Sequence, residues 1–111
     1  MHTNSHGDLP DELVKSAYRS GVELAWPRDQ AIEAIEALAR SGRKLLGIDT
    51  WLLTDDDPPK PIPLIRDWSA DLQAGADEIA SSATAFIADF RCRPDDCNPD
   101  NRPVYFNLVV K

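Results

Sequence analysis

Histidine is almost missing from this 111-residue sequence. The only two histidines, His2 and His6, lie among the first six residues, so the body of the chain has no imidazole. A nucleophilic serine or cysteine needs such a base beside it. Glycine-rich phosphate-binding motifs are missing as well. We therefore expect no catalytic residues of these kinds and a protein that is not an enzyme.

Cysteine is also scarce, and the two that occur, Cys92 and Cys97, enclose Arg-Pro-Asp-Asp. A structural zinc site needs four ligands, and no second pair of Cys or His accompanies this one. We therefore expect no metal and no cofactor. A disulfide across so short a loop is geometrically possible, whereas a reducing cytoplasm would keep both thiols free. The sequence leaves both states open.

Long apolar runs do not occur either, and none approaches the roughly 20 residues of a membrane span. The first eight residues, MHTNSHGD, lack the charged-then-apolar layout of a secretory signal. We expect a cytoplasmic protein that does not bind membranes.

Basic residues are outnumbered, with 12 Lys and Arg against 19 Asp and Glu, which gives a net charge of −7. Direct binding of nucleic acid needs a basic footprint that displaces counterions from phosphate, so we expect none. A negative protein is instead attracted to a positively charged protein partner.

The apolar residues that are present follow clear periods. Helical spacing predicts helices over residues 8–19, from Pro27 to the Ser41-Gly42 pair, and over residues 76–91. β-compatible runs predict strands at residues 45–53, 62–68 and 104–110. Residues 22–26 are expected to form a connector, with Trp26 in the core.

These elements predict one small α+β domain at residues 8–111, after a flexible lead at residues 1–7. About three helices would pack on one face of a two- to three-stranded mixed sheet. If residues 45–53 pair with residues 104–110 across the third helix, the two strands would be parallel and the crossover right-handed. An intervening strand at residues 62–68 could instead make the arrangement mixed, so the strand order stays open.

The acidic stretch IDTWLLTDDD, residues 48–57, is the main candidate for a site. Asp49 lies within the predicted strand, and Asp55, Asp56 and Asp57 follow it. They could form a solvated turn, an acidic surface for a basic partner, or a metal or catalytic site. The spacing lacks the alternating ligands and final Glu of a calcium loop. Trp51 and Trp68 lie near aspartates, and either could be core or an anchor for a basic surface.

The run from Leu45 to Trp51, directly after a helix ending in Ser-Gly, resembles the strand motif of the immunity protein 40 family. That motif is Leu-Gly-Gly-Asp followed by an aliphatic and an aromatic residue. Ile48 replaces its second glycine, and Asp67-Trp68 stands in place of an Asn-Trp pair. The resemblance covers residues 22–110 and includes a helix and a final β run, carried by Ala83, Phe86, Ile87, Phe90 and residues 105–110.

The resemblance implies an immunity protein (antitoxin) that binds and neutralises a cognate bacterial polymorphic toxin without catalysis. Its partner would be the toxin domain, possibly a basic nuclease. The expected toxin-facing residues are Asp49, Trp51, Asp55, Asp56, Asp57, Asp67 and Trp68. The alternatives are a carboxylate-based metal-binding or hydrolytic protein and a structural or regulatory adaptor.

Overall fold

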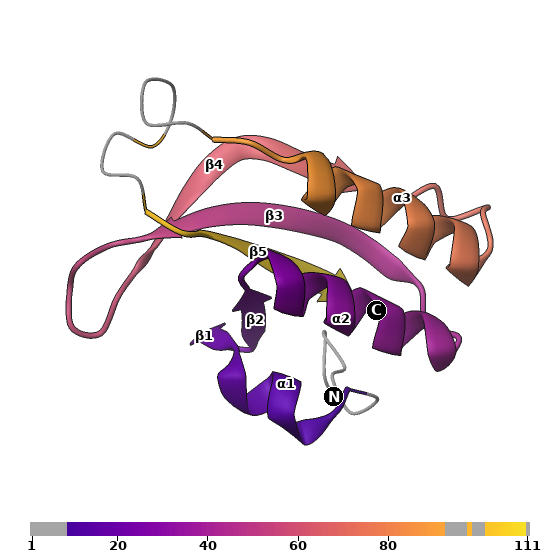
Figure 1. Ribbon diagram of the computed structural model, residues 1–111, viewed down its shortest axis with the longest axis horizontal. Coiled ribbons are helices and arrows are strands. Elements are labelled where there is room, and N and C mark those ends of the chain that lie inside the picture. Colours follow the sequence, from indigo (N-terminus) through magenta and orange to yellow (C-terminus); the bar gives the residue numbers. More distant parts are fainter. Residues whose placement is uncertain (1–8, 93–97, 99–101, 111) are drawn as a thin grey trace.

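A computed structural model describes residues 9–92, 98 and 102–110 of the chain. This part contains three helices and five strands, which confirms the α+β class (Figure 1). The helices are α1 (Asp11–Ser16), α2 (Arg28–Arg40) and α3 (Ala76–Asp89). The strands are β1 (Tyr18–Ser20), β2 (Glu23–Trp26), β3 (Leu45–Leu53), β4 (Pro61–Ser69) and β5 (Val104–Val110).

All five described strands form one curled sheet in the order β1-β2-β5-β3-β4, and every neighbouring pair is antiparallel (Figure 1). The prediction of a two- to three-stranded mixed sheet is therefore wrong. The extra strands come from residues 18–26, where β1 and β2 pair around Gly21. Gly21 has φ 62°, which suits glycine in a tight two-residue hairpin turn. The predicted helix at 8–19 is accordingly cut short at Ser16.

The parallel arrangement considered for residues 45–53 and residues 104–110, on the condition that they pair directly across the third helix, does not occur. β3 and β5 are neighbours, as expected, but they are antiparallel, with Ile48 opposite Leu108. The reason is that β4 forms an intervening antiparallel partner of β3 and reverses the chain before α3. Consequently β4 and β5 run in the same direction, with β3 between them and α3 as their connection.

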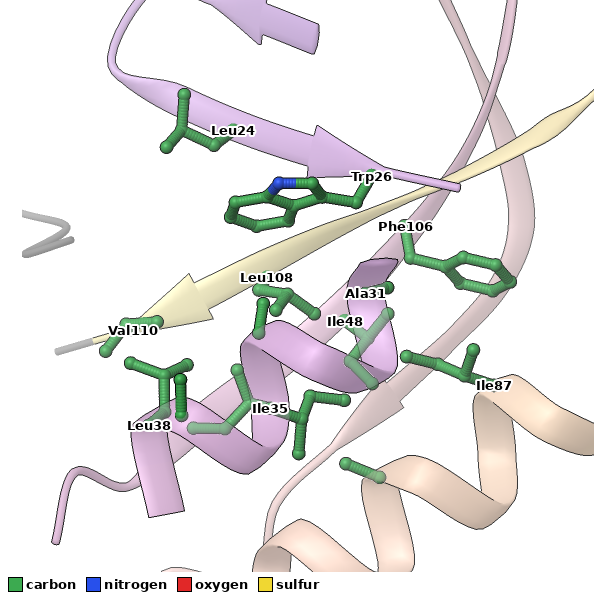
Figure 2. Close-up of a cluster of buried hydrophobic side chains, with 14 of the residues drawn as sticks. Leu24, Trp26, Ala31, Ile35, Leu38, Ile48, Ile87, Phe106, Leu108 and Val110 are labelled. Atoms are coloured by element: carbon green, nitrogen blue, oxygen red, sulfur yellow. The ribbon is translucent and has the colours of Figure 1, made fainter. Parts of the chain in front are cut away.

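The core lies between the sheet and the helices α2 and α3; Leu13 of α1 and Leu9, just before this helix, add to it. Figure 2 shows residues of α2, α3 and the three strands β2, β3 and β5 converging there. Trp26 is fully buried, which confirms its predicted core position, and its Nε1–H donates to the Leu13 carbonyl at 2.7 Å. Ile48 has its side chain in this core.

Arg28, at the start of α2, joins the helical layer to the sheet. Its guanidinium donates to the carbonyls of Ile87, Ala88 and Phe90 at the end of α3. It also lies over the Phe106 ring of β5, 5.9 Å from the ring centroid. Burial lowers the pKa of Arg28, and the charge of Arg91 adds to this effect. The contacts fix the position of α3 against α2 and β5.

Candidate functional site

The face of the sheet away from α2 and α3, here the open face, carries one row of side chains across all five strands. Direct cross-strand partners place their side chains on the same face of an antiparallel sheet. The pairing puts five residues in line, running from β1 to β4: Tyr18, Ala25, Asn107, Asp49 and Asp67. We call its last three members, Asn107, Asp49 and Asp67, the acidic row.

Asp49 and Asp67 are both exposed, and neither has an ion-pair or hydrogen-bond partner among the residues that the structure describes. The pKa of Asp49 is raised above its ordinary value of 3.8. Partial burial of the carboxyl is the main cause, and the negative charge of Asp67 is the second. The two carboxylates thus form a negative site that no cation of the described residues neutralises.

Asn107 lies next to Asp49 in this row, but its side chain is fully buried. Its Nδ2–H donates to the Leu24 carbonyl of β2 at 2.9 Å. Its Oδ1 is buried and has no hydrogen-bond partner among the described residues. Because buried side-chain oxygens are nearly always hydrogen-bonded, this atom marks a place where a donor is missing.

Three aromatic side chains border the acidic row. Tyr18 meets Trp51 edge-on, with 6.2 Å between ring centroids, and meets Tyr105 at 6.3 Å. The Tyr18 hydroxyl donates to the Pro59 carbonyl, in the loop between β3 and β4, at 2.8 Å. β1 is therefore joined across the open face to the β3–β4 hairpin. Trp51 is only 8% exposed, so it serves this packing more than it contacts solvent.

The three consecutive aspartates lie away from the acidic row. β3 continues from Asp49 to Leu53 before the loop begins, which places Asp55 roughly 20 Å along the chain at about 3.3 Å per strand residue. Asp55 forms a two-pronged ion pair with Arg102, at 2.8 and 2.9 Å. Asp56 accepts a hydrogen bond from the Thr54 hydroxyl at 2.9 Å. Of the three carboxylates, Asp55 is therefore neutralised by an ion pair, whereas Asp56 and Asp57 are exposed to solvent.

Trp68 projects to the opposite face from its neighbour Asp67. It is the cross-strand partner of the core residue Ile48, and it packs partly buried against the core. Its Nε1–H donates to the Ser82 hydroxyl of α3 at 3.2 Å. The structure thus brings Asp49 and Asp67 together, with Trp51 of β3 in the aromatic cluster that borders them. Asp55–Asp57 and Trp68 lie elsewhere.

Sequence reasoning missed three residues of this region, namely Asn107, Tyr105 and Tyr18. Two of them have a usable signal in the sequence, because the apolar residues Val104, Phe106, Leu108 and Val110 alternate along the strand and so share one face. Tyr105 and Asn107 therefore had to point to the other face. Tyr18 had no such signal, since it fell inside a predicted helix.

Other candidate ligands do not add to this site. Among the described residues, no three His, Cys, Asp or Glu side chains are grouped so that they could hold a metal ion. Cys92 is half-buried and disulfide-bonded. Cys97, His2 and His6 lie outside the described residues. No helix in the described ranges has the length and apolar character needed to cross a membrane.

Comparisons with models of known protein families, with curated protein sequences and with solved structures give no significant match.

Proposed function

We propose that this chain is a non-enzymatic immunity protein that binds and neutralises a cognate bacterial toxin domain through the open face of its sheet. The observation that carries the proposal is the direct pairing of Asp49 with Asp67, both exposed and without a cationic partner in the described part of the chain. The sequence resemblance to the immunity protein 40 family supplies the biological class. The net charge of −7 supplies the attraction to a basic partner.

Like charges placed directly opposite each other on a sheet destabilise it. Asp49 and Asp67 therefore work against folding, and no positive group in the described ranges offsets their repulsion, whereas one from another molecule would. A basic toxin surface would supply that group, and a nuclease domain is basic where it meets its nucleic acid substrate. Covering that surface would block the toxin.

The open face is suited to this role because its shape is fixed before the partner arrives. The Tyr18–Trp51–Tyr105 cluster and the Tyr18–Pro59 hydrogen bond join the edges of the sheet around the acidic row. A preformed surface loses little conformational freedom on binding, which favours tight association. Within the predicted toxin-facing set, Asp49 and Asp67 would therefore contact the toxin directly, and Trp51 would support them. The Asp55–Asp57 loop would contribute long-range attraction.

The proposal is tested by co-expressing the chain with the product of the gene immediately upstream in a bacterial host. We expect the upstream product alone to be toxic and the pair to grow and to co-purify as a complex. The double variant Asp49→Asn/Asp67→Asn should lose most of the protection. Glu33→Gln removes a charge from the exposed side of α2, on the helical layer, and should protect fully.

An upstream product that is not toxic, or protection without a complex, would refute the proposal. A regulatory adaptor would then be the better description of the chain. The variant Asp56→Asn/Asp57→Asn separates the two parts of the predicted surface. It should slow association without abolishing protection, because exposed charges mainly affect the rate of encounter.

A further inference from the structure

We infer that the acidic row is a binding site for one guanidinium group, supplied by an arginine side chain of the protein partner. The inference deepens the proposed function and rests on it for the source of the arginine. It names the chemical group that the open face binds and the three residues that hold it.

The acidic row presents only acceptors. Asp49 and Asp67 contribute carboxylate oxygens, and Asn107 contributes Oδ1. The buried Oδ1 is an independent sign of a ligand, because an acceptor that is removed from water and left without a donor is costly. Within the residues that the structure describes, all three groups therefore lack an N–H donor, and the two carboxylates also lack a positive partner.

The orientation of the Asn107 amide places its free oxygen within this row. Its Nδ2–H is committed to the Leu24 carbonyl of β2, on one side of β5. Oδ1 is the other end of the planar amide, and β3 with Asp49 is the neighbour on the other side of β5. A donor that binds Asp49 is therefore next to Asn107 in the row, and it reaches Oδ1 once the atoms that cover the buried Asn107 side chain move aside.

The arrangement suits guanidinium better than a metal ion. Neighbouring cross-strand side chains are about 4.5–5.5 Å apart at Cβ, so the row is a flat line of acceptors. Guanidinium is planar, keeps its charge, and carries five N–H donors in a fixed fork. A calcium or magnesium ion instead needs oxygens that converge to about 2.0–2.6 Å. The ammonium of lysine has three donors on one point and cannot span the line as well.

The two carboxylates of the site are accessible, and the Asn107 side chain is fully buried. Asp49 and Asp67 are exposed, and the aromatic cluster borders the row on one side only, through Trp51 and Tyr105. On the other side the next residue of β3 on this face is Gly47, which has no side chain. An arginine can therefore enter over Gly47 and lie against the row.

The test uses the full chain, labelled with nitrogen-15, and N-acetyl-arginine-amide as the probe at constant ionic strength and neutral pH. We expect saturable shifts of the Asn107 side-chain amide and of the backbone amides of Asp49 and Asp67. N-acetyl-lysine-amide should bind several-fold more weakly. Asp49→Asn and Asp67→Asn should each weaken arginine binding by about tenfold or more, because each removes a charge-assisted hydrogen bond.

Glu33→Gln is the matched control, since it removes one negative charge far from the open face, and its arginine affinity should equal that of the wild type. Shifts that do not saturate, or an equal loss in Glu33→Gln, would show only general charge attraction and overturn the inference. Stronger binding of Mg²⁺ or Ca²⁺ than of arginine at the same residues would overturn it in favour of a metal site. Both Asn variants are at exposed positions, and their dispersed spectra would show that they fold.

This experiment and the toxin test can fail separately. Arginine binding without protection from the upstream product would retain the guanidinium site and reject the immunity function. Protection that survives Asp49→Asn/Asp67→Asn, with no arginine binding, would retain the function and reject the site.

Discussion

Asp49 of β3 and Asp67 of β4 are direct cross-strand partners, and both carboxylates are exposed on the same face of the sheet. Two like charges in this register repel each other. Residues that serve a binding site often reduce the stability of the free protein. Removing the charge of either aspartate should therefore raise the stability of the free protein, whereas it should weaken binding to the partner.

Asp49→Asn should raise the free energy of unfolding at pH 7 by a few tenths to about 1 kcal/mol. The gain comes from removing the repulsion with Asp67 and the partial desolvation of the carboxylate. Urea denaturation measures it as a higher midpoint with an unchanged slope. Glu33→Gln should leave the midpoint nearly unchanged. A lower midpoint for Asp49→Asn would mean that Asp49 makes a stabilising contact.

The difference in stability between the wild type and Asp49→Asn should depend on pH. The pKa of Asp49 is raised in the folded protein, so the folded state holds this proton more tightly than the unfolded state. The loss of folding stability caused by ionised Asp49 is therefore absent below the ordinary pKa of the carboxyl. It develops as the pH rises through the raised pKa of the folded protein. Unfolding of wild type and Asp49→Asn between about pH 3 and about pH 7 should give stabilities that converge at the acid end. A difference that stays constant with pH would contradict the assignment.

Tyr18→Phe should lower stability modestly, by about 0.5–1 kcal/mol, because it removes the hydrogen bond to the Pro59 carbonyl and keeps the ring. Amide hydrogen exchange in the β3–β4 loop should become faster, since this bond joins the loop to β1. Tyr105→Phe is the matched control, because the Tyr105 hydroxyl has no hydrogen-bond partner among the described residues. Equal effects of the two changes would show that the Tyr18–Pro59 bond contributes nothing.

Gly47→Ala should destabilise the protein by roughly 1 kcal/mol or more. A Cβ at Gly47 would lie 3.0 Å from the Trp68 carbonyl oxygen, and this backbone atom of the neighbouring strand cannot move away freely. At Gly75 the same change meets no atom within 4 Å. Alanine lowers the conformational entropy of the unfolded chain, which stabilises the fold and offsets the weaker helix cap. Gly75→Ala should therefore change the midpoint of thermal unfolding little. Thermal unfolding of the two variants gives the comparison.

The sequence predicted those elements whose apolar period is long and regular. The strands at residues 45–53 and 104–110 have the expected bounds, and α2 and α3 differ at their ends by one or two residues. β1 and β2 were missed because three or four residues are too few to establish a period. The antiparallel pairing of β3 with β5 could not be predicted from the sequence either, since it depends on contacts between distant segments.

The site was predicted in part for a similar reason. Asp49 and Asp67 were both named, but only the register of β3 with β4 makes them partners. That register shifts between Asp49 and Trp51, where β4 contains two additional residues. Trp68 was expected beside Asp67 on one surface, but neighbouring residues of a strand point to opposite faces. Asn107 was overlooked because a single amide in an apolar strand carries no motif.

The central position of β5 has a consequence for how the sheet is assembled. The β1–β2 hairpin and the β3–β4 hairpin are each local, but in the described sheet they are joined only through β5. β5 is also the last of the described elements along the chain. A growing chain can therefore form both hairpins early, yet it holds neither the acidic row nor the closed aromatic border until residues 104–110 insert between them. A chain interrupted before Val104 would carry Asp49 and Asp67 on a hairpin without Asn107 beside them.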